Sequence, residues 1–333
     1  MITDESGPRD GTVPRARPVN RRPGWPAALL RGGSLRAQRA RTGMILVSPA
    51  FALVAVFVLF PLGFAVYISL TNWPLIGSYQ FTGGRNYTEL IHDPVFLHSV
   101  LFTLLYTAIV TGPILVLGYA MAAFVRANRP GSVVFRTAFF LPFIVGLATE
   151  SFMLLLELQP DSGVVDTVLG KLGLASVTTA WTVHYDLALG VICVFVVWFA
   201  SGLTMMILMG GMQGIPGDLY EAANVDGATW WQKERRITIP MLRRSIALSL
   251  IISVIGSFLA FNQFYILTEG GPGTSTEPIV MWIYQEAFIA YHLGYATAGA
   301  IALVIVVGII SAAQFFLLRD DDTIPKTRSV RRG

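Results

Sequence analysis

The stretch Glu221–Pro240, EAANVDGATWWQKERRITIP, is a charged interruption between two long apolar runs. It carries six Asp, Glu, Lys and Arg residues, whereas residues 187–213 and 245–267 on either side carry none. A charged interruption of this kind is where a soluble partner can bind a protein that is otherwise embedded in a membrane.

The composition indicates a membrane protein. The residues are 54% hydrophobic and 13% charged, whereas soluble domains carry about 25% charged residues. Six stretches reach the roughly 20 apolar residues that a helix needs to cross about 30 Å of hydrocarbon. They are 44–70, 99–125, 137–158, 186–212, 245–267 and 295–318, the third interrupted by Glu150 and Glu157. We therefore predict an all-α membrane protein with six transmembrane helices, and we exclude 279–292 as too short and polar for a seventh.

The distribution of positive charge predicts the orientation in the membrane. Of the 24 Lys and Arg residues, all except Arg85 and Lys171 fall in the two tails or in the loops 126–136 and 213–244. Because Lys and Arg accumulate on the cytoplasmic side, we expect both termini to be cytoplasmic. This bias also accounts for the net charge of +4 without any nucleic-acid partner.

The remaining features limit the chemistry of the chain. Residues 1–43 are rich in Arg, Pro and Gly and are expected to be a disordered cytoplasmic tail, with 319–333 as a second tail. An amphipathic lipid-surface helix at 25–41 is the alternative, although Pro26 and Gly32-Gly33 argue against a long one. One cysteine, Cys193, allows no disulfide within the chain, and the four histidines show no metal-ligand spacing. No GxxxxGK[ST] sequence occurs. We therefore expect a non-catalytic chain that binds no cofactor or metal.

The opening stretch resembles the loop by which permease subunits of bacterial ABC importers dock onto their ATPase. The family pattern is Glu-Ala-Ala, three residues, Gly, nine residues, Ile, one residue, Leu-Pro. It is matched by Glu221, Ala222, Ala223, Gly227, Ile237 and Pro240, with Ile239 in place of Leu. The resemblance implies a type I ABC importer permease fold over 44–318, a cytoplasmic coupling loop at 213–243, and ATP and Mg bound by a separate ATPase.

The local sequence predicts how this loop is built. We expect Asp218 to cap a helix from about Leu219 to Asp226, with Glu221 as its capping-box partner, and Gly227 to adopt the left-handed conformation that ends it. The residues expected to couple to the ATPase are Asp218, Leu219, Glu221, Ala222, Ala223, Asp226, Gly227 and Pro240. The small alanines would let this helix enter a cleft, and Pro240 marks entry into the fifth span.

A second stretch, FNQFYILTEGGPGTST at 261–276, is similar to carbohydrate importer permeases of the maltose/glycerol-phosphate group, and the likeness extends over about 44–318. It implies a bacterial cytoplasmic membrane location, a sister permease, an ATPase dimer and an extracytoplasmic sugar-binding protein. That protein would contact Gly270, Gly271, Pro272 and Gly273, unless these form only a flexible turn. The chain departs from the group at Asp166, where Asn is commoner, and lacks its usual Trp in the third span.

A sugar pathway needs amide or carboxyl groups and aromatic surfaces that converge in a concave site. The candidates are Glu150, Thr149, Trp198, Ser201, Phe258, Phe261, Asn262 and Gln263. A carboxylate within a span points to a functional site, although Glu150 can also be a hydrogen-bonded structural residue. Trp198 can equally be a packing residue, and Asn262 and Gln263 can simply join helices.

Two other functions remain open from the sequence. An ABC importer permease for a polyamine, phosphate or osmolyte would share the docking loop. An ATP-independent carrier would leave that loop unexplained, and it would be expected to show inverted repeats or buried proton-relay carboxylates.

Overall fold

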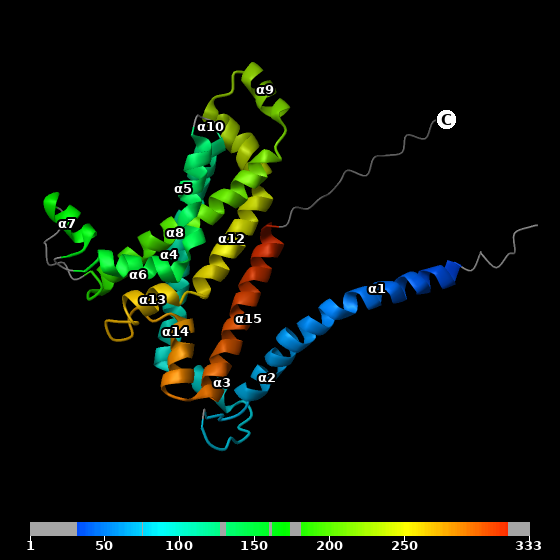
Figure 1. Ribbon diagram of the computed structural model, residues 1–333, viewed down its shortest axis with the longest axis vertical. Helices are drawn as coiled ribbons and strands as arrows, with labels where there is room; N and C mark the ends of the chain where they lie inside the picture. The colour runs from blue at the N-terminus through cyan, green and yellow to red at the C-terminus, as the bar shows by residue number, and fades with distance from the viewer. Residues whose placement is uncertain (1–31, 75, 127–130, 160–161, 174–180, 319–333) are drawn as a thin grey trace, which may run out of the picture. The chain divides into compact units, whose positions relative to one another are not determined.

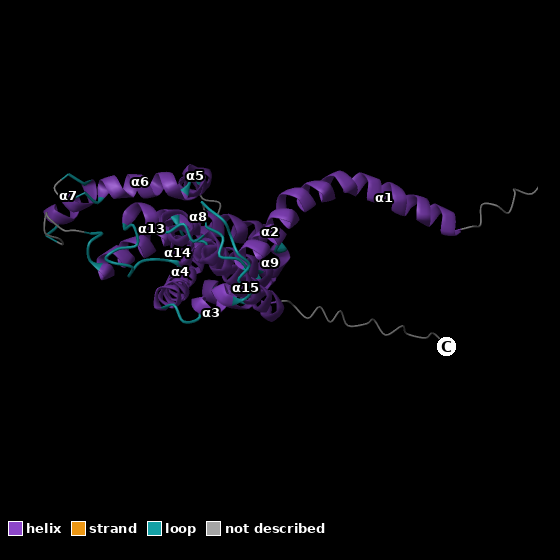
Figure 2. Cartoon of the chain, turned by 90° about the horizontal axis from the view of Figure 1, so that it is seen from below, coloured by secondary structure: helices purple, strands orange, loops and turns teal. Residues whose placement is uncertain are grey.

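The computed structural model describes residues 32–74, 76–126, 131–159, 162–173 and 181–318. Within them all regular secondary structure is helical, apart from one isolated bridge between Thr71 and Phe81. The chain divides into two compact units, 1–61 and 62–333. Figures 1 and 2 show the helices, and each unit is described by itself.

The first unit is a helix, α1 (Gly32–Val54), which continues through a π-helical turn, η2 (Ala55–Leu59). Together with α2 (Phe60–Ser69) it supplies the apolar stretch Thr42–Ser69, which is long enough to cross a membrane. The described residues are helical from 32 through 43, so the end of the tail expected to be disordered is helical, in the region where a helix was the alternative. The reason is local, because SLRAQRAR at 34–41 consists largely of good helix formers. The disorder predicted for 1–31 and 319–333 lies outside the described residues.

The second unit is organised around three long helices. These are α4 (Pro94–Arg126), α8 (Tyr185–Gln213) and α15 (Leu293–Leu318), and with 42–69 they confirm four of the six predicted spans. Helix α4 packs along α8. At their contact a Cβ on Gly118 would lie 2.5 Å from the Thr204 side chain, so a small residue lets the two backbones approach.

The third predicted span, 137–158, is a bent pair of helices instead of one continuous helix, and the pair together is long and apolar enough to count as one span. Helix α5 (Ser132–Val145) and helix α6 (Leu147–Glu157) meet at an angle of 94°. The bend falls at Gly146, whose φ of 94° and ψ of 141° are readily available only to glycine. The bend points α6 and its Glu150 away from the axis of α5.

The fifth predicted span, 245–267, is also shorter than expected. Helix α12 (Arg243–Phe258) ends before Phe261, whose φ of −141° and ψ of −59° are not helical, and α13 (Asn262–Leu267) is a separate helix. Before α12 come α10 (Trp230–Lys233), η3 (Glu234–Thr238) and α11 (Ile239–Met241), bent by 69° from it.

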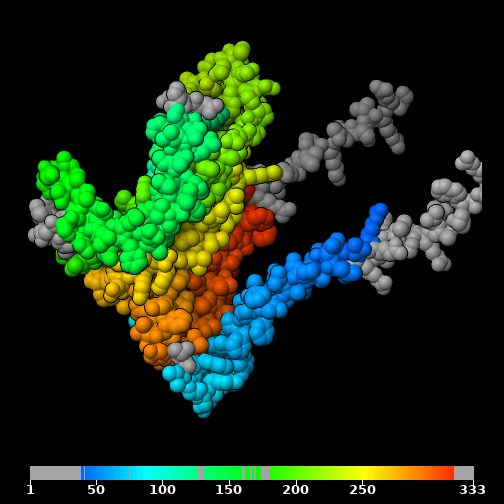
Figure 3. All heavy atoms as spheres, viewed as in Figure 1, coloured from blue at the N-terminus to red at the C-terminus, as the bar shows by residue number. Residues whose placement is uncertain are grey.

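Short helices occupy the two ends of the second unit. One end carries α9 (Gly217–Val225) and α10, which protrude from the helices below them (Figure 3). The opposite end carries α3 (Arg85–Leu90), α14 (Ile279–Tyr284) and η4 (Gln285–Ile289). Helix α7 (Val164–Lys171) follows α6 and packs against it.

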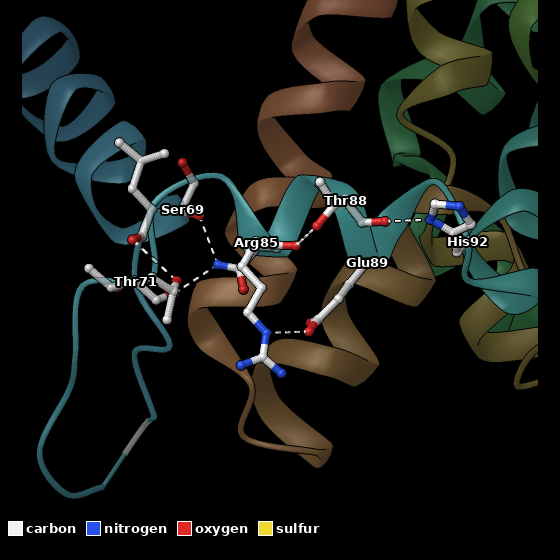
Figure 4. Close-up of polar contacts among 9 residues, drawn as sticks. Ser69, Thr71, Arg85, Thr88, Glu89 and His92 are labelled. Carbon is white, nitrogen blue, oxygen red and sulfur yellow. Dashed lines mark hydrogen bonds and ion pairs between the residues drawn. The ribbon is translucent and has the colours of Figure 1, made fainter.

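Polar contacts fix the end that carries α3. The Asn86 amide donates to the carbonyl oxygens of Ser69 and Thr71, both at 2.8 Å. Arg85 donates to Glu89 at 2.7 Å (Figure 4). These contacts hold α3 against the turn that follows α2.

Candidate functional site

Helix α9 is the first helix of the coupling segment, residues 217–241, which lies within the predicted coupling loop 213–243. It has no buried residue, and Leu219, Glu221 and Ala222 are exposed while Ala223 is half-buried. Its end is as predicted, because Gly227 has a φ of 68° and donates its N–H to the Asn224 carbonyl at 3.1 Å. The helix thus presents its apolar and acidic side chains to the surroundings, as a surface that enters a partner's cleft must.

The beginning of α9 differs from the prediction. Pro216 precedes the helix, and no side chain caps it, so the expected capping box between Asp218 and Glu221 does not form. The capping box lies instead at the next helix, where Thr229 and Gln232 exchange hydrogen bonds at 2.7 and 3.3 Å. Asp218 falls inside the first turn, where its charge favours the positive end of the helix dipole.

Side-chain contacts tie α9 to the rest of the segment. The Tyr220 hydroxyl lies 2.9 Å from Thr238 Oγ1, and Lys233 Nζ donates to Asn224 Oδ1 at 2.9 Å. Helix α9 and the segment before α12 are therefore fastened together at two points, and a displacement of one carries the other.

A second set of contacts fastens the segment to α4. The Tyr119 hydroxyl of α4 donates to the buried carboxylate of Glu234. The guanidinium carbon of Arg126 lies 4.4 Å from the ring centre of Tyr220. Sequence reasoning missed these residues, because each depends on a neighbour more than ten positions away; the only signal was a carboxylate, Glu234, in an otherwise basic run.

Part of the predicted substrate pathway comes together in one cavity. A cavity of about 630 Å³ lies between α6 and α8 and includes Glu150 and Trp198. It also includes three residues that were not predicted as site residues: Glu157, Trp181 and Asp186. Apolar side chains such as Met153 and Val194 make up most of the remaining wall. The exposed wall is almost entirely apolar, so the cavity offers two indole surfaces to a ligand, and the three carboxylates contribute little of its surface.

The other predicted pathway residues do not line this cavity. Thr149 is exposed beside it, whereas Phe258 is buried in the protein. Ser201 is fully buried, and its hydroxyl donates to the Trp198 carbonyl at 2.9 Å and lies 3.6 Å from Met121 Sδ. In this conformation Ser201 and Phe258 are packing residues, because helix neighbours surround them.

The residues around the start of α13 form a separate group. Gln263 is only 2% exposed; its Nε2 donates to the Tyr106 hydroxyl at 3.2 Å, and its Oε1 has no partner in the described structure. Phe261 stacks on Tyr265 with ring centres 5.1 Å apart, and Asn262 is exposed. Gln263 therefore joins two helices and still offers an unused acceptor.

The loop after α13 is ordered. Gly270 and Gly273 have φ values of 83° and 65°, and Thr276 Oγ1 donates to Thr268 Oγ1 or to the Gly271 carbonyl at 2.9 and 2.6 Å. Pro272 and Gly273 are exposed, while Gly270 is buried. Hydrogen bonds thus connect the base of the loop beneath its exposed tip.

Glu277 closes this loop and is an unusual residue. It is 1% exposed, and neither carboxylate oxygen has a hydrogen-bond partner among the described residues. Burial, with a smaller contribution from the charges of Glu286 and Asp93, raises the pKa of its carboxyl to about 7. No group of three or more His, Cys, Asp or Glu residues within the described ranges could hold a metal ion.

Comparisons with known proteins agree with this arrangement. Residues 114–320 match the family model described as binding-protein-dependent transport system inner membrane component. The sulfoquinovosyl glycerol transport system permease protein SmoG of Agrobacterium fabrum is 31% identical, over 84% of this chain and 91% of its own length. The lactose transport system permease protein LacF of Rhizobium radiobacter is 30% identical, over 86% and 97%.

Among solved structures, a chain of a bacterial alginate ABC transporter in complex with an alginate pentasaccharide-bound periplasmic protein has the same fold. Its TM-score is 0.75 at 20% identity, over 85% of this chain and 95% of that chain. The predicted ABC importer permease fold is thereby confirmed.

Proposed function

Because the chain belongs to the family of binding-protein-dependent transport system inner membrane components, we propose that it is one permease subunit of a bacterial ATP-driven sugar importer. It works in the cytoplasmic membrane with a sister permease, an ATPase dimer and an extracytoplasmic binding protein. ATP and Mg are bound by the ATPase. Both termini and α9 face the cytoplasm, in keeping with the distribution of Lys and Arg.

The observation that carries the proposal is the attachment of α9. The helix exposes Glu221 and Ala222 for a partner, while Tyr220 and Glu234 connect the segment to Thr238 and to Tyr119 of α4. A push on α9 is therefore transmitted to α4 and α12 instead of bending a loose loop. Rigid-body movement of this kind alternates access between the two sides of a membrane.

A sugar is the substrate class that we assign, chiefly because of the relatives. Trp181 and Trp198 offer flat apolar surfaces for the faces of a pyranose ring, and Glu150, Glu157 and Asp186 can accept hydrogen bonds from its hydroxyls. The relatives named for lactose and sulfoquinovosyl glycerol support this choice. The exposed tip of the loop, at Pro272 and Gly273, is the surface we assign to the binding protein, whereas Gly270 is buried and cannot be part of that contact.

The test is reconstitution of the chain with its co-purifying subunits in proteoliposomes. We expect sugar uptake only when ATP is on the side of the membrane that carries α9 and the ATPase, and the binding protein is on the opposite side. Uptake of sugar by this chain alone, without an ATPase, would overturn the proposal. Uptake that requires ATP but accepts only a polyamine, phosphate or osmolyte would support the permease role and overturn the assignment of a sugar substrate.

A further inference from the structure

A second cavity lies at the end of the second unit that carries α9. It has a volume of about 310 Å³ and is formed by the ends of α4, α5 and α8 and the beginning of α9. Its apolar part consists of four buried side chains, Val125, Met209, Met212 and Ile215. Its polar part consists of Arg126, Arg136, Gln213 and Tyr220. The cavity is therefore apolar on one side and positively charged on the other.

Neither of the two arginines contacts a carboxylate of a described residue. Within the described part of the chain neither Arg126 nor Arg136 forms an ion pair, whereas Arg85 at the opposite end pairs with Glu89. The Nε of Arg136 is buried and has no hydrogen-bond acceptor. A buried donor without a partner costs about 1–3 kcal/mol, and more when it is charged. The cavity is thus incomplete as it stands, and an anion would complete it.

Nearby acids do not fill this role. Asp218 follows Gly217 in the first turn of α9 but does not line the cavity. Glu234 accepts a hydrogen bond from the Tyr119 hydroxyl and keeps its charge, but it does not line the cavity. Arg126 is held over the Tyr220 ring, and this contact fixes the position of its guanidinium without neutralising the charge.

The chemistry favours a phosphate group over other anions. Guanidinium groups present planar pairs of N–H donors that fit phosphate oxygens, and two of them can share one phosphate. The four apolar side chains offer a surface for a hydrocarbon portion next to it. Basic pockets between membrane helices at this depth are suited to phospholipid head groups.

We propose that the cavity between Arg126 and Arg136 binds a phosphate group at the cytoplasmic face of the membrane. Its placement at that face rests on the orientation proposed above. The phosphate belongs either to an anionic phospholipid or to a soluble phosphate compound. Because Tyr220 of α9 lines the same cavity, occupancy steadies the coupling helix against α4 and α5.

The proposal is tested by direct binding, without measuring transport. The chain, purified with its co-purifying subunits, is placed in nanodiscs of phosphatidylcholine with or without phosphatidylglycerol, and bound phosphatidylglycerol is counted by native mass spectrometry. In a second arm, binding of radiolabelled inorganic phosphate is measured in phosphatidylcholine alone. The variant carries Arg126→Gln and Arg136→Gln. The control is Arg39→Gln, which removes one exposed positive charge elsewhere on the predicted cytoplasmic side.

We expect the double variant to lose affinity by about tenfold or more in one arm, since each lost contact is a charge-assisted hydrogen bond. Loss in the first arm identifies a lipid as the source, and loss in the second identifies a soluble phosphate. Equal binding by the double variant and by Arg39→Gln in both arms overturns the proposal. So does a double variant that loses the ATPase while both arms are unchanged, because the arginines would then serve the partner protein.

A milder variant covers the case in which the double variant does not purify intact. Arg136→Lys keeps the charge but removes the buried Nε and the planar fork, so we expect affinity to fall by about threefold. Unchanged affinity in Arg136→Lys would also overturn the proposal. Failure of sugar transport in the wild type would leave both binding measurements interpretable.

Discussion

The coupling segment and the cavity between α6 and α8 are built in opposite ways. Residues 217–241 form the coupling segment as one continuous stretch, and its first helix has no buried residue. The cavity takes Glu150, Trp181 and Trp198 from three separate stretches. They meet because the chain turns by 94° at Gly146. A site made of residues that are close in the sequence can be predicted from their spacing. A site that a bend in the chain brings together cannot be predicted in this way.

The two ends of the second unit also treat a buried carboxylate differently. Glu234 at the coupling end is 6% exposed and accepts a hydrogen bond from Tyr119. Glu277 at the opposite end is 1% exposed and has no partner among the described residues. The first carboxylate therefore fastens two helices together, while the second is a cost to stability whenever it is ionised.

The largest effect is expected from a charge reversal on α9. Glu221→Lys leaves the permease folded, because Glu221 is exposed, but it reverses the charge on the surface that we propose enters the ATPase cleft, so electrostatic complementarity with the ATPase is lost. We expect ATP-dependent uptake in proteoliposomes to fall by about 100-fold. Sugar affinity of the binding protein should not change.

The isosteric variant Glu221→Gln separates charge from shape at the same position. It should retain more uptake than Glu221→Lys. Uptake by Glu221→Lys within about twofold of wild type would show that α9 is not the coupling surface.

The next effect concerns the unpartnered carboxyl. The pKa of Glu277 is raised from 4.5 to about 7, so between these values the unfolded chain releases a proton that the folded chain retains. The free energy of unfolding therefore falls as pH rises through this window, by up to about 3 kcal/mol, and levels off above it. Glu277→Gln should remove this slope and be more stable than wild type above about pH 7.

Thermal unfolding at roughly pH 5 and pH 8 measures this difference. Glu269→Gln is the matched control, because Glu269 lies in the same loop and is exposed, so it should keep the wild-type slope. An unchanged slope in Glu277→Gln would show that another group titrates.

A smaller effect is expected in the cavity. Trp198→Ala removes a 44% exposed indole that faces the cavity. The sugar concentration that gives half-maximal uptake should rise by about tenfold, as the loss of one aromatic contact predicts. Trp198→Phe keeps an aromatic ring, so its half-saturating sugar concentration should lie between those of the wild type and Trp198→Ala. A lower amount of protein with unchanged half-saturation would assign Trp198 to packing instead.

The smallest effect is expected from a variant that removes one of the hydrogen bonds between α9 and the rest of the coupling segment. Tyr220→Phe removes the 2.9 Å contact with Thr238 but keeps the ring beneath Arg126. Loss of one hydrogen bond costs about 0.5–1.5 kcal/mol, so we expect the stimulation of ATPase activity by the loaded binding protein to fall by about threefold.

Tyr87→Phe is the control for this measurement, since it removes a 2.7 Å contact with Ser69 at the opposite end. It should leave the stimulation unchanged. Equal effects of Tyr220→Phe and Tyr87→Phe would mean that the hydrogen bond supports stability in general and not coupling.

The fold was largely predictable because its strongest signals are local. Long apolar runs predict α4, α8, α15 and the span at 42–69, and the structure confirms these four. The third and fifth spans were each predicted as one straight helix, but the structure divides each of them. Mean hydropathy is averaged over a window and does not detect a single residue with positive φ, such as Gly146. The expected cap at Asp218 failed for a similar reason, since Pro216 already sets the entry into α9.

By itself, the amino-acid sequence determined the membrane class, the position of the coupling helix and the glycine that ends it. These depend on composition and on contacts within a few residues. Only the tertiary structure decided which side chains hold α9 in place, which carboxylates and indoles share the cavity beside α6, and that Arg126 and Arg136 share another cavity without contacting a described carboxylate. Such contacts join residues far apart in the sequence, 115 positions in the case of Tyr119 and Glu234, and they exist only once the helices have packed.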